Sequence, residues 1–144
     1  MVDSPIVIAE SLAGKRIAVT GSTGFVGTAL VERLLRSVPD CELILLVRDG
    51  KRTPAAQRVE RELFRNDAFD RLRELHDGPD SNETFAEMTS RRVTTITGDV
   101  SRDGLGLDDD DRRLFSTADI VIHSAATVSF DSPLDRAVEI NLLG

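Results

Sequence analysis

A glycine-rich segment near the amino-terminus has the residue types and spacing of a loop that binds phosphate. It reads Thr-Gly-Ser-Thr-Gly-Phe-Val-Gly over Thr20–Gly27. Gly21 permits a tight turn, Gly24 lets a ligand approach the backbone, and Gly27 lets a following helix pack closely. Free N–H groups at the start of that helix then face a diphosphate. The segment predicts a dinucleotide site, and the alternative is a tight strand-to-helix turn with no ligand.

The end of the next apolar segment carries the residues that would choose between two cofactors. A carboxylate there accepts hydrogen bonds from the ribose hydroxyls of NAD, whereas an arginine pairs with the 2′-phosphate of NADP. The sequence has Arg48 at this point, with Lys51 and Arg52 just beyond. These cations favour NADPH over NADH. Asp49 beside them suits a ribose hydroxyl, and ordinary loop cations are the alternative.

Two further predicted strand ends supply the rest of one site. Asp99 and Val100 follow the third strand, where a carboxylate accepts from the adenine amino group and a valine packs on the ring. Ala125, Ala126 and Thr127 follow the fourth strand, and their small side chains leave room for the ribose and nicotinamide. Doubly wound sheets bind ligands at the carboxyl ends of their strands, so we expect these residues to converge.

Strands and helices alternate along the chain and position these residues. Apolar or β-branched runs predict strands at Arg16–Thr20, Glu42–Val47, Val93–Thr97 and Asp119–Ile122. The segments between and after them predict helices at Phe25–Arg36, Pro54–His76, Asp108–Ser116 and Pro133–Leu143. Residues 1–14 are expected to form a leader that ends in a turn. The predicted fold is α/β, a doubly wound parallel sheet of Rossmann type in strand order 3-2-1-4.

The composition excludes several classes of protein. The chain has 144 residues, of which 40% are hydrophobic, and this suits one domain with a buried core. A formal charge of −7 argues against nonspecific binding to nucleic acid. No apolar run is long enough to span a membrane, and no signal peptide is visible. The single cysteine, Cys41, excludes an internal disulfide and favours a cytoplasmic compartment, and no metal site is expected.

These motifs resemble the extended short-chain dehydrogenase/reductase family. Within that family, the chain is similar to the amino-terminal, NADP-binding part of fatty acyl-CoA reductases over roughly Leu12 to Gly144. The similarity to this subfamily is carried by Leu46-Val-Arg48, Leu63-Phe64, the run Ala68–Arg73, the run His123–Asp131, and Ala137-Val-Glu-Ile-Asn141. The glycine motif and Gly98-Asp-Val100 are specific to the wider family.

The resemblance implies NADPH-dependent reduction of a long-chain acyl thioester to an aldehyde or an alcohol. It places the glycine loop at the diphosphate, Arg48 at the 2′-phosphate, Asp99 and Val100 at adenine, and Ala125 to Thr127 beside the nicotinamide ribose. The predicted cofactor-binding residues are Gly21, Ser22, Thr23, Gly24, Phe25, Val26, Gly27, Arg48, Arg52, Asp99, Val100, Ala125, Ala126 and Thr127.

No catalytic residue is predicted in this chain. The family that it resembles uses a tyrosine and a lysine four residues later, assisted by a serine or threonine, all beyond a fifth strand. This chain has no tyrosine, and both of its lysines, Lys15 and Lys51, precede the fourth strand. We expect residues 1–144 to be the amino-terminal part of a single NAD(P)-binding domain, with the catalytic and substrate-binding parts elsewhere in a longer reductase. Cys41, His76 and His123 are expected to be structural or site-lining.

Other functions fit some of the same residues. A sugar-nucleotide epimerase or a carboxylic-acid reductase domain also fits the glycine loop, and the missing tyrosine allows a non-catalytic NADP-binding module. The expected partners are the dinucleotide and, for a longer protein, a long-chain acyl thioester. A substrate with a long acyl chain would also be compatible with contact between the longer protein and a membrane surface. An unpaired edge of the fourth strand predicts self-association.

Overall fold

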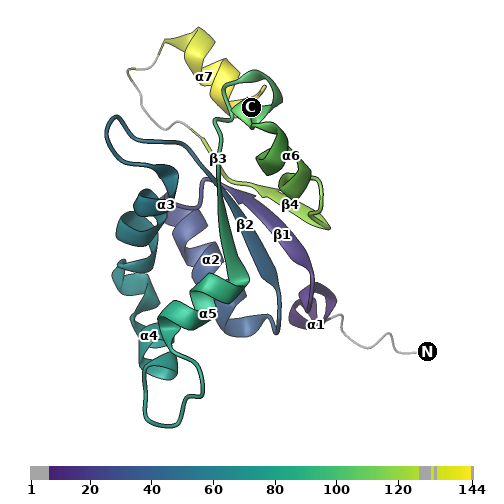
Figure 1. The fold of residues 1–144 in the computed structure, drawn as a ribbon. Coiled ribbons are helices and arrows are strands. Elements are labelled where there is room, and N and C mark those ends of the chain that lie inside the picture. Colours follow the sequence, from purple (N-terminus) through teal and green to yellow (C-terminus); the bar gives the residue numbers. More distant parts are fainter. Residues whose placement is uncertain (1–6, 127–130, 132, 144) are drawn as a thin grey trace, which may run out of the picture.

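Four short strands form one parallel sheet in the computed structural model, which describes residues 7–126, 131 and 133–143 (Figure 1). The strands are β1 (Arg16–Thr20), β2 (Glu42–Val47), β3 (Val93–Thr97) and β4 (Ile120–His123). Their order is β3-β2-β1-β4, which confirms the predicted topology. The register pairs Thr20 with both Leu46 and His123, so the carboxyl ends of three strands lie level with one another.

Helices of very different length lie before, between and after these strands. They are α1 (Ile8–Leu12), α2 (Phe25–Ser37), α3 (Ala55–Arg58), the π-helical η1 (Val59–Phe64), the 3₁₀-helical η2 (Asp67–Phe69), α4 (Asp70–His76), α5 (Phe85–Arg92), the 3₁₀-helical η3 (Asp103–Gly106), α6 (Asp109–Phe115) and α7 (Leu134–Asn141). The prediction of a leader over residues 1–14 missed α1, whereas α2, α6 and α7 lie within two residues of their predicted bounds.

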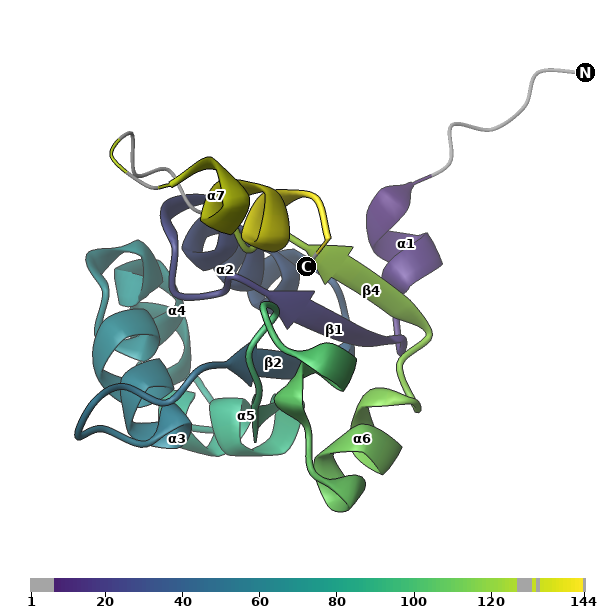
Figure 2. The same cartoon turned by 90° about the horizontal axis from the view of Figure 1, so that it is seen from above.

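The sheet is covered on both faces. Ile17, Ala18 and Val19 of β1 have no exposed surface, and because consecutive residues of a strand point to opposite faces, each face must be packed. One face packs against α2 and the helical segments between β2 and β3, and the other against η3 and α6 (Figure 2). The strand ends that face α7, at the top of Figure 1, are thereby held on a rigid core.

The predicted continuous helix over Pro54–His76 is wrong. The chain there forms α3, η1, η2 and α4 in succession, with a break at Asn66. Asn66 has an extended backbone (φ −68°, ψ 142°), and its side chain accepts a hydrogen bond from the Ala68 amide at 2.9 Å. Asparagine side chains cap a new helical turn in this way, and this competes with continuing the previous helix.

Helix α5 was not expected from the sequence, although a local signal for it exists. Thr84 and Glu87 form a reciprocal capping box at its start, a pattern that marks helix N-termini. Phe85 then packs edge-to-face with Phe64 and Phe69, at ring-centroid distances of 5.9 and 6.2 Å. This aromatic contact holds α5 against the segment that replaces the predicted helix.

Strand β4 lies at one end of the sheet and pairs with β1 alone among the described strands. Val121 on this strand is 53% exposed. Self-association through this edge stays a prediction, because an open strand edge templates pairing with another chain. Size-exclusion chromatography at high protein concentration tests it, and a monomer under those conditions would contradict it. None of the helices in the described part of the chain is both long and apolar enough to cross a membrane.

Candidate functional site

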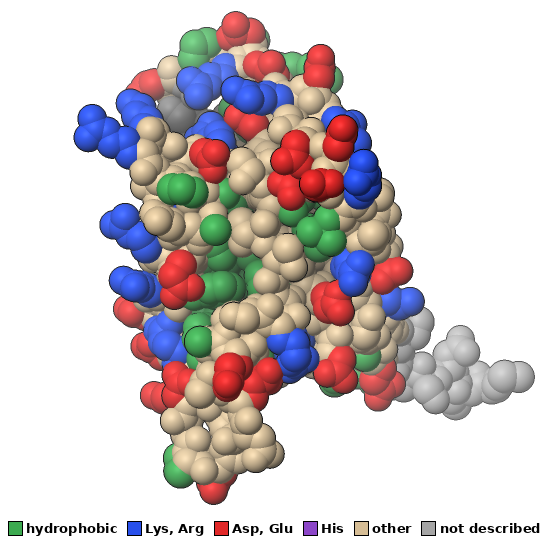
Figure 3. Space-filling view, viewed as in Figure 1, with side chains coloured by type: hydrophobic (Ala, Val, Ile, Leu, Met, Phe, Trp, Pro, Cys, Tyr) green, Lys and Arg blue, Asp and Glu red, His purple; other side chains and the backbone are tan. Residues whose placement is uncertain are grey.

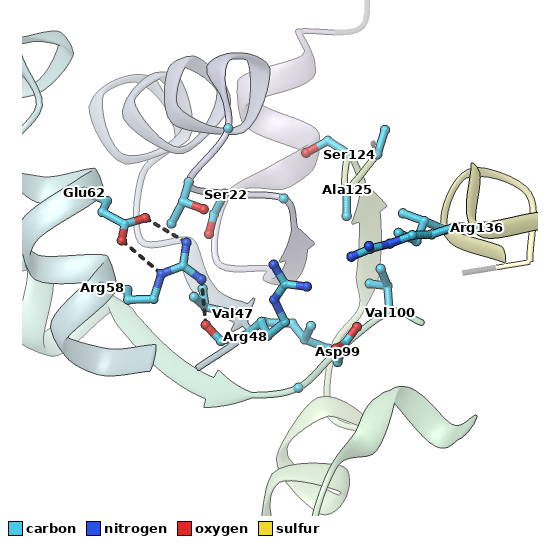
Figure 4. Close-up of a pocket in the computed structure, with 17 residues that line it drawn as sticks. Ser22, Val47, Arg48, Arg58, Glu62, Asp99, Val100, Ser124, Ala125 and Arg136 are labelled. Carbon is cyan, nitrogen blue, oxygen red and sulfur yellow. Dashed lines mark hydrogen bonds and ion pairs between the residues drawn. The ribbon is translucent and has the colours of Figure 1, made fainter. Parts of the chain in front are cut away.

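A pocket of about 700 Å³ lies where the carboxyl ends of the strands meet the glycine loop and α7 (Figure 4). This volume is in the range of small-molecule and cofactor sites. Its lining residues come from all four strand ends and from the helical elements α3, η1 and α7. They are Gly21, Ser22, Thr23, Gly24, Leu46, Val47, Arg48, Arg58, Glu62, Gly98, Asp99, Val100, Ser124, Ala125, Ala126, Arg136 and Ile140.

Two glycines of the loop are required by close backbone contacts. Gly21 has φ +72°, and a Cβ atom on it would lie 2.6 Å from the backbone nitrogen of Ala125. A Cβ atom on Gly27 would lie 2.0 Å from the carbonyl oxygen of Gly21. Real Cβ atoms do not approach backbone so closely, so these positions let the loop pass between β4 and α2. Gly24 faces open space apart from the Gly21 oxygen at 3.3 Å.

Thr20, the first residue of the glycine-rich segment, links the end of β1 to the end of β4. Its hydroxyl accepts from the amides of Ser124 and Ala125, both at 3.2 Å, and lies 2.8 Å from His123 Nδ1. Because both amides donate to the Thr20 oxygen, the hydroxyl proton is directed to Nδ1, which places the ring proton of a neutral His123 on Nε2. The hydroxyl of Ser124 donates back to the Thr20 carbonyl oxygen at 2.7 Å.

Ser22 presents a buried hydroxyl in the wall of the pocket. The residue is 1% exposed, and its Oγ has no hydrogen-bond partner within the described part of the chain. Buried hydroxyl groups nearly always have a partner, and an unpaired one costs about 1–3 kcal/mol. The pocket therefore contains an unused donor beside the glycine loop, which fits a ligand with phosphate oxygens.

The amino-terminus of α2 follows the same loop. Its N-cap is Gly24, which has no side chain to accept from the first-turn amides. Phe25 and Val26 are 95% and 65% exposed and lie just outside the pocket lining. The first turn of a 13-residue helix thus points toward the pocket without a side-chain cap. Such a terminus favours negative charge, because its unpaired N–H groups carry the positive end of the helix dipole.

Two arginines line the β2 side of the pocket. The Arg48 side chain forms no hydrogen bond or ion pair with another described residue, and its guanidinium points into the pocket (Figure 4). Arg58 donates to both carboxylate oxygens of Glu62, at 2.9 and 2.8 Å, and to the Arg48 carbonyl oxygen at 2.7 Å. These bonds use three of the five N–H groups of Arg58 and leave two available. Arg58 was missed because nothing distinguishes it from other charged residues of a polar helix.

Other charged residues after β2 lie away from the pocket. Asp49 accepts from the Ala55 amide at 2.7 Å and so caps α3. Arg52 is exposed and does not line the pocket. On the face of the molecule that Figure 3 shows, Lys and Arg side chains are interspersed with Asp and Glu. The positive charge inside the pocket is therefore a local feature of the lining, not part of a uniformly basic surface.

Asp99 has one carboxylate oxygen engaged by its own loop. Oδ1 accepts from the amide and the hydroxyl of Ser101, at 2.9 and 2.7 Å. Burial raises the pKa of Asp99, but the Ser101 hydrogen bonds and the charges of Arg48 and Arg102 outweigh it and hold the pKa below its usual value. The group is therefore ionised at neutral pH, and its second oxygen is available to accept a hydrogen bond.

The structure brings most of the predicted site residues to one pocket. Those that line it are Gly21, Ser22, Thr23, Gly24, Arg48, Asp99, Val100, Ala125 and Ala126. Gly27 is buried behind the loop, and Thr127 lies outside the described residues. Residues that sequence reasoning did not assign to the pocket include Arg58, Glu62, Arg136 and Ile140.

The chain is similar in sequence to known proteins. The chain is 37% identical to fatty acyl-CoA reductase 1 of Arabidopsis thaliana, over 94% of this chain and 27% of the relative. It is 35% identical to the fatty acyl-CoA reductase wat of Drosophila melanogaster, over 90% of this chain and 23% of the relative. The chain thus spans about a quarter of the length of these relatives.

A solved structure gives the same fold. The reductase domain of a non-ribosomal peptide synthetase from Mycobacterium tuberculosis superposes with a TM-score of 0.56 and is 34% identical, over 86% of this chain and 28% of that one. A family model described as male sterility protein, an NAD-binding family, matches residues 19–144. The chain therefore belongs to the male sterility protein family of NAD-binding domains, and its cofactor is a nicotinamide dinucleotide.

Proposed function

We propose that this chain is the NADPH-binding part of a reductase that acts on long-chain fatty acyl-CoA. The observation that carries the proposal is the Arg48 guanidinium, which points into the strand-end pocket and forms no hydrogen bond or ion pair with the residues that the structure describes. The curated relatives named above are fatty acyl-CoA reductases, and they support the substrate class.

The pocket supports a dinucleotide that lies across the strand ends. The glycine loop, with the first turn of α2 and the Ser22 hydroxyl, would hold the diphosphate. The free oxygen of Asp99 would accept from the adenine amino group, with Val100 against the ring. The small side chains of Ala125 and Ala126 would leave room for the nicotinamide ribose.

The preference for NADPH rests on the charges that follow β2. Selection of NADH at such a strand end requires a carboxylate that accepts from the ribose hydroxyls. Asp49 is the nearest carboxylate in sequence, but it caps α3 and does not line the pocket. Arg48 and the two unused N–H groups of Arg58 offer a fork that suits a phosphate. Glu62 holds the Arg58 fork in place from behind.

The proposed reaction is a two-electron reduction. NADPH and one proton would convert the thioester to an aldehyde: a C–H bond would form at the carbonyl carbon, the C–S bond would break, and the proton would complete the thiol of coenzyme A, leaving NADP⁺. A second NADPH and a second proton would give the alcohol. Residues of this chain bind and orient the cofactor, and the chain contains no tyrosine to serve as the acid.

The first test is a titration of the chain with NADPH and NADH, followed by the fluorescence of the reduced nicotinamide. Because the chain has no Trp or Tyr, protein emission does not interfere. We expect Arg48→Ala to weaken NADPH binding about 30-fold, the range for loss of charge-assisted hydrogen bonds, and to change NADH binding less than threefold. Arg113→Ala, on α6 outside the pocket, is the matched control. Equal weakening of both cofactors would contradict a 2′-phosphate contact.

The second test addresses the reaction. The complete gene product is expected to oxidise NADPH when palmitoyl-CoA is added, with release of one thiol for each aldehyde formed. Thiol release measured with a disulfide reagent and aldehyde trapped by a hydrazine provide two independent readouts. NADPH binding without any acyl-CoA turnover would instead support the non-catalytic binding module.

A further inference from the structure

A third arginine reaches the pocket from the opposite direction. Arg136 lies on α7, beyond β4, and lines the same pocket as the glycine loop. Ile140 of the same helix also lines it, and residues four apart occupy one face of a helix. Figure 4 shows the Arg136 side chain extending past Val100 and Ala125 toward the middle of the pocket, on the side away from Arg58 and Ser22.

The Arg136 guanidinium points at the same space as that of Arg48. Arg136 forms no ion pair or hydrogen bond with any residue that the structure describes. Two cations directed into one pocket repel each other unless an anion lies between them, and the chain as a whole carries a charge of −7. Asp99 offsets part of this charge, because its carboxylate faces Arg48 and Arg102, but the pocket lining still holds three arginines against the two carboxylates of Asp99 and Glu62. The arrangement therefore favours an anionic ligand.

The position of Arg136 indicates which anionic group it would meet. Arg48 and Arg58 come from the β2 side, where the adenosine ribose of a dinucleotide lies, and Arg136 comes from the β4 side. Between the two halves of the ligand lies the diphosphate, which the glycine loop approaches from one side. We propose that Arg136 is a further binding residue that contacts the diphosphate from the side opposite the loop, so that α7 closes the site.

This inference rests on the proposed function. Binding of three ligands distinguishes a failure of the inference from a failure of the proposed function. NADPH has both a diphosphate and a 2′-phosphate, NADH has a diphosphate alone, and adenosine 2′-monophosphate has a 2′-phosphate alone. We expect Arg136→Ala to weaken NADPH and NADH by the same factor of about ten, the low end for a charge-assisted contact because the residue is exposed to solvent. Competition by adenosine 2′-monophosphate should be unchanged in this variant and strongly reduced in Arg48→Ala.

One conservative variant and one control variant complete the test. Arg136→Lys keeps the charge but loses the bidentate fork, and we expect an intermediate loss. Arg113→Ala is the control for a lost surface arginine, and far-UV circular dichroism checks that each variant is folded. Affinities within twofold of wild type for both dinucleotides would overturn the role of Arg136 and leave the proposed function intact. A loss restricted to NADPH would overturn the diphosphate contact, and a wild-type chain that binds neither dinucleotide would overturn both proposals.

Discussion

Gly27→Ala is expected to lower the free energy of unfolding by roughly 3 kcal/mol and to remove measurable NADPH binding. The new Cβ atom would lie 2.0 Å from the Gly21 carbonyl oxygen and 2.7 Å from Ser22 Cα. Both contacts are with backbone, which cannot rotate away as a side chain does, and overpacking of this kind costs typically 1–3 kcal/mol or more. Helix propensity acts in the opposite direction, since alanine within a helix such as α2 is favoured over glycine by only about 1 kcal/mol. The steric cost is the larger effect, so Gly27→Ala is expected to destabilise the fold.

The measurement is urea unfolding followed by far-UV circular dichroism, because the chain has no Trp or Tyr for fluorescence. Gly14→Ala is the matched control. Gly14 has φ +67° but nothing within 4 Å of its Cβ position, so we expect a loss of about 1 kcal/mol from backbone strain alone. A Gly27→Ala variant no less stable than Gly14→Ala would contradict the close packing of the loop on α2.

Arg92→Ala is expected to lower the free energy of unfolding by about 3 kcal/mol, although Arg92 does not line the pocket. Arg92 is 8% exposed and donates to the carbonyl oxygens of Leu35, Val38 and Cys41 at 2.7–2.9 Å. Two of these carbonyls lie at the carboxyl end of α2, whose dipole favours a cation. Removal of the guanidinium leaves buried acceptors unpaired and a cavity in their place, and both effects are destabilising.

The neighbouring arginine provides the control for Arg92. Arg91 is on the same helix but pairs with Glu83 at the surface, with Nε 2.7 Å from Oε1. Because solvent screens such pairs, Arg91→Ala should change the urea midpoint far less than Arg92→Ala does. Arg92→Lys should fall between the two, since an ammonium group keeps the charge but cannot reach three carbonyls in one plane. Equal midpoints for the Arg91 and Arg92 alanine variants would show that the buried guanidinium is not a structural tie.

The strands and their order followed from local sequence patterns. Glu42–Val47 and Val93–Thr97 have the predicted bounds in the structure, because a short apolar run marks the first strand and a short β-branched run marks the second. The order 3-2-1-4 then followed from the handedness of parallel crossovers. The roles of the glycines could also be predicted, since the turn and the close contacts that require them form within a few residues of the loop.

The helical region between β2 and β3 was decided by tertiary contacts. Asn66 interrupts the predicted helix, and the three phenylalanines that pack together come from η1, η2 and α5. Helix propensity differs by tenths of a kcal/mol per residue, so aromatic packing and side-chain caps outweigh it. The capping box at Thr84 was a local signal that would have indicated α5.

The sequence by itself determined the fold class, the strand ends that meet and the kind of ligand they receive. Only the tertiary structure decided which arginines reach the pocket. Arg52 and Asp49 are near Arg48 in sequence but point elsewhere, whereas Arg58 and Arg136 arrive from helices on opposite sides of the sheet edge. The physical reason is the distance between a residue's backbone and the atoms that contact the ligand. A glycine meets a steric requirement at its own backbone position, which local sequence reveals. The end of a long arginine side chain lies where its helix is packed, and that packing depends on residues far along the chain.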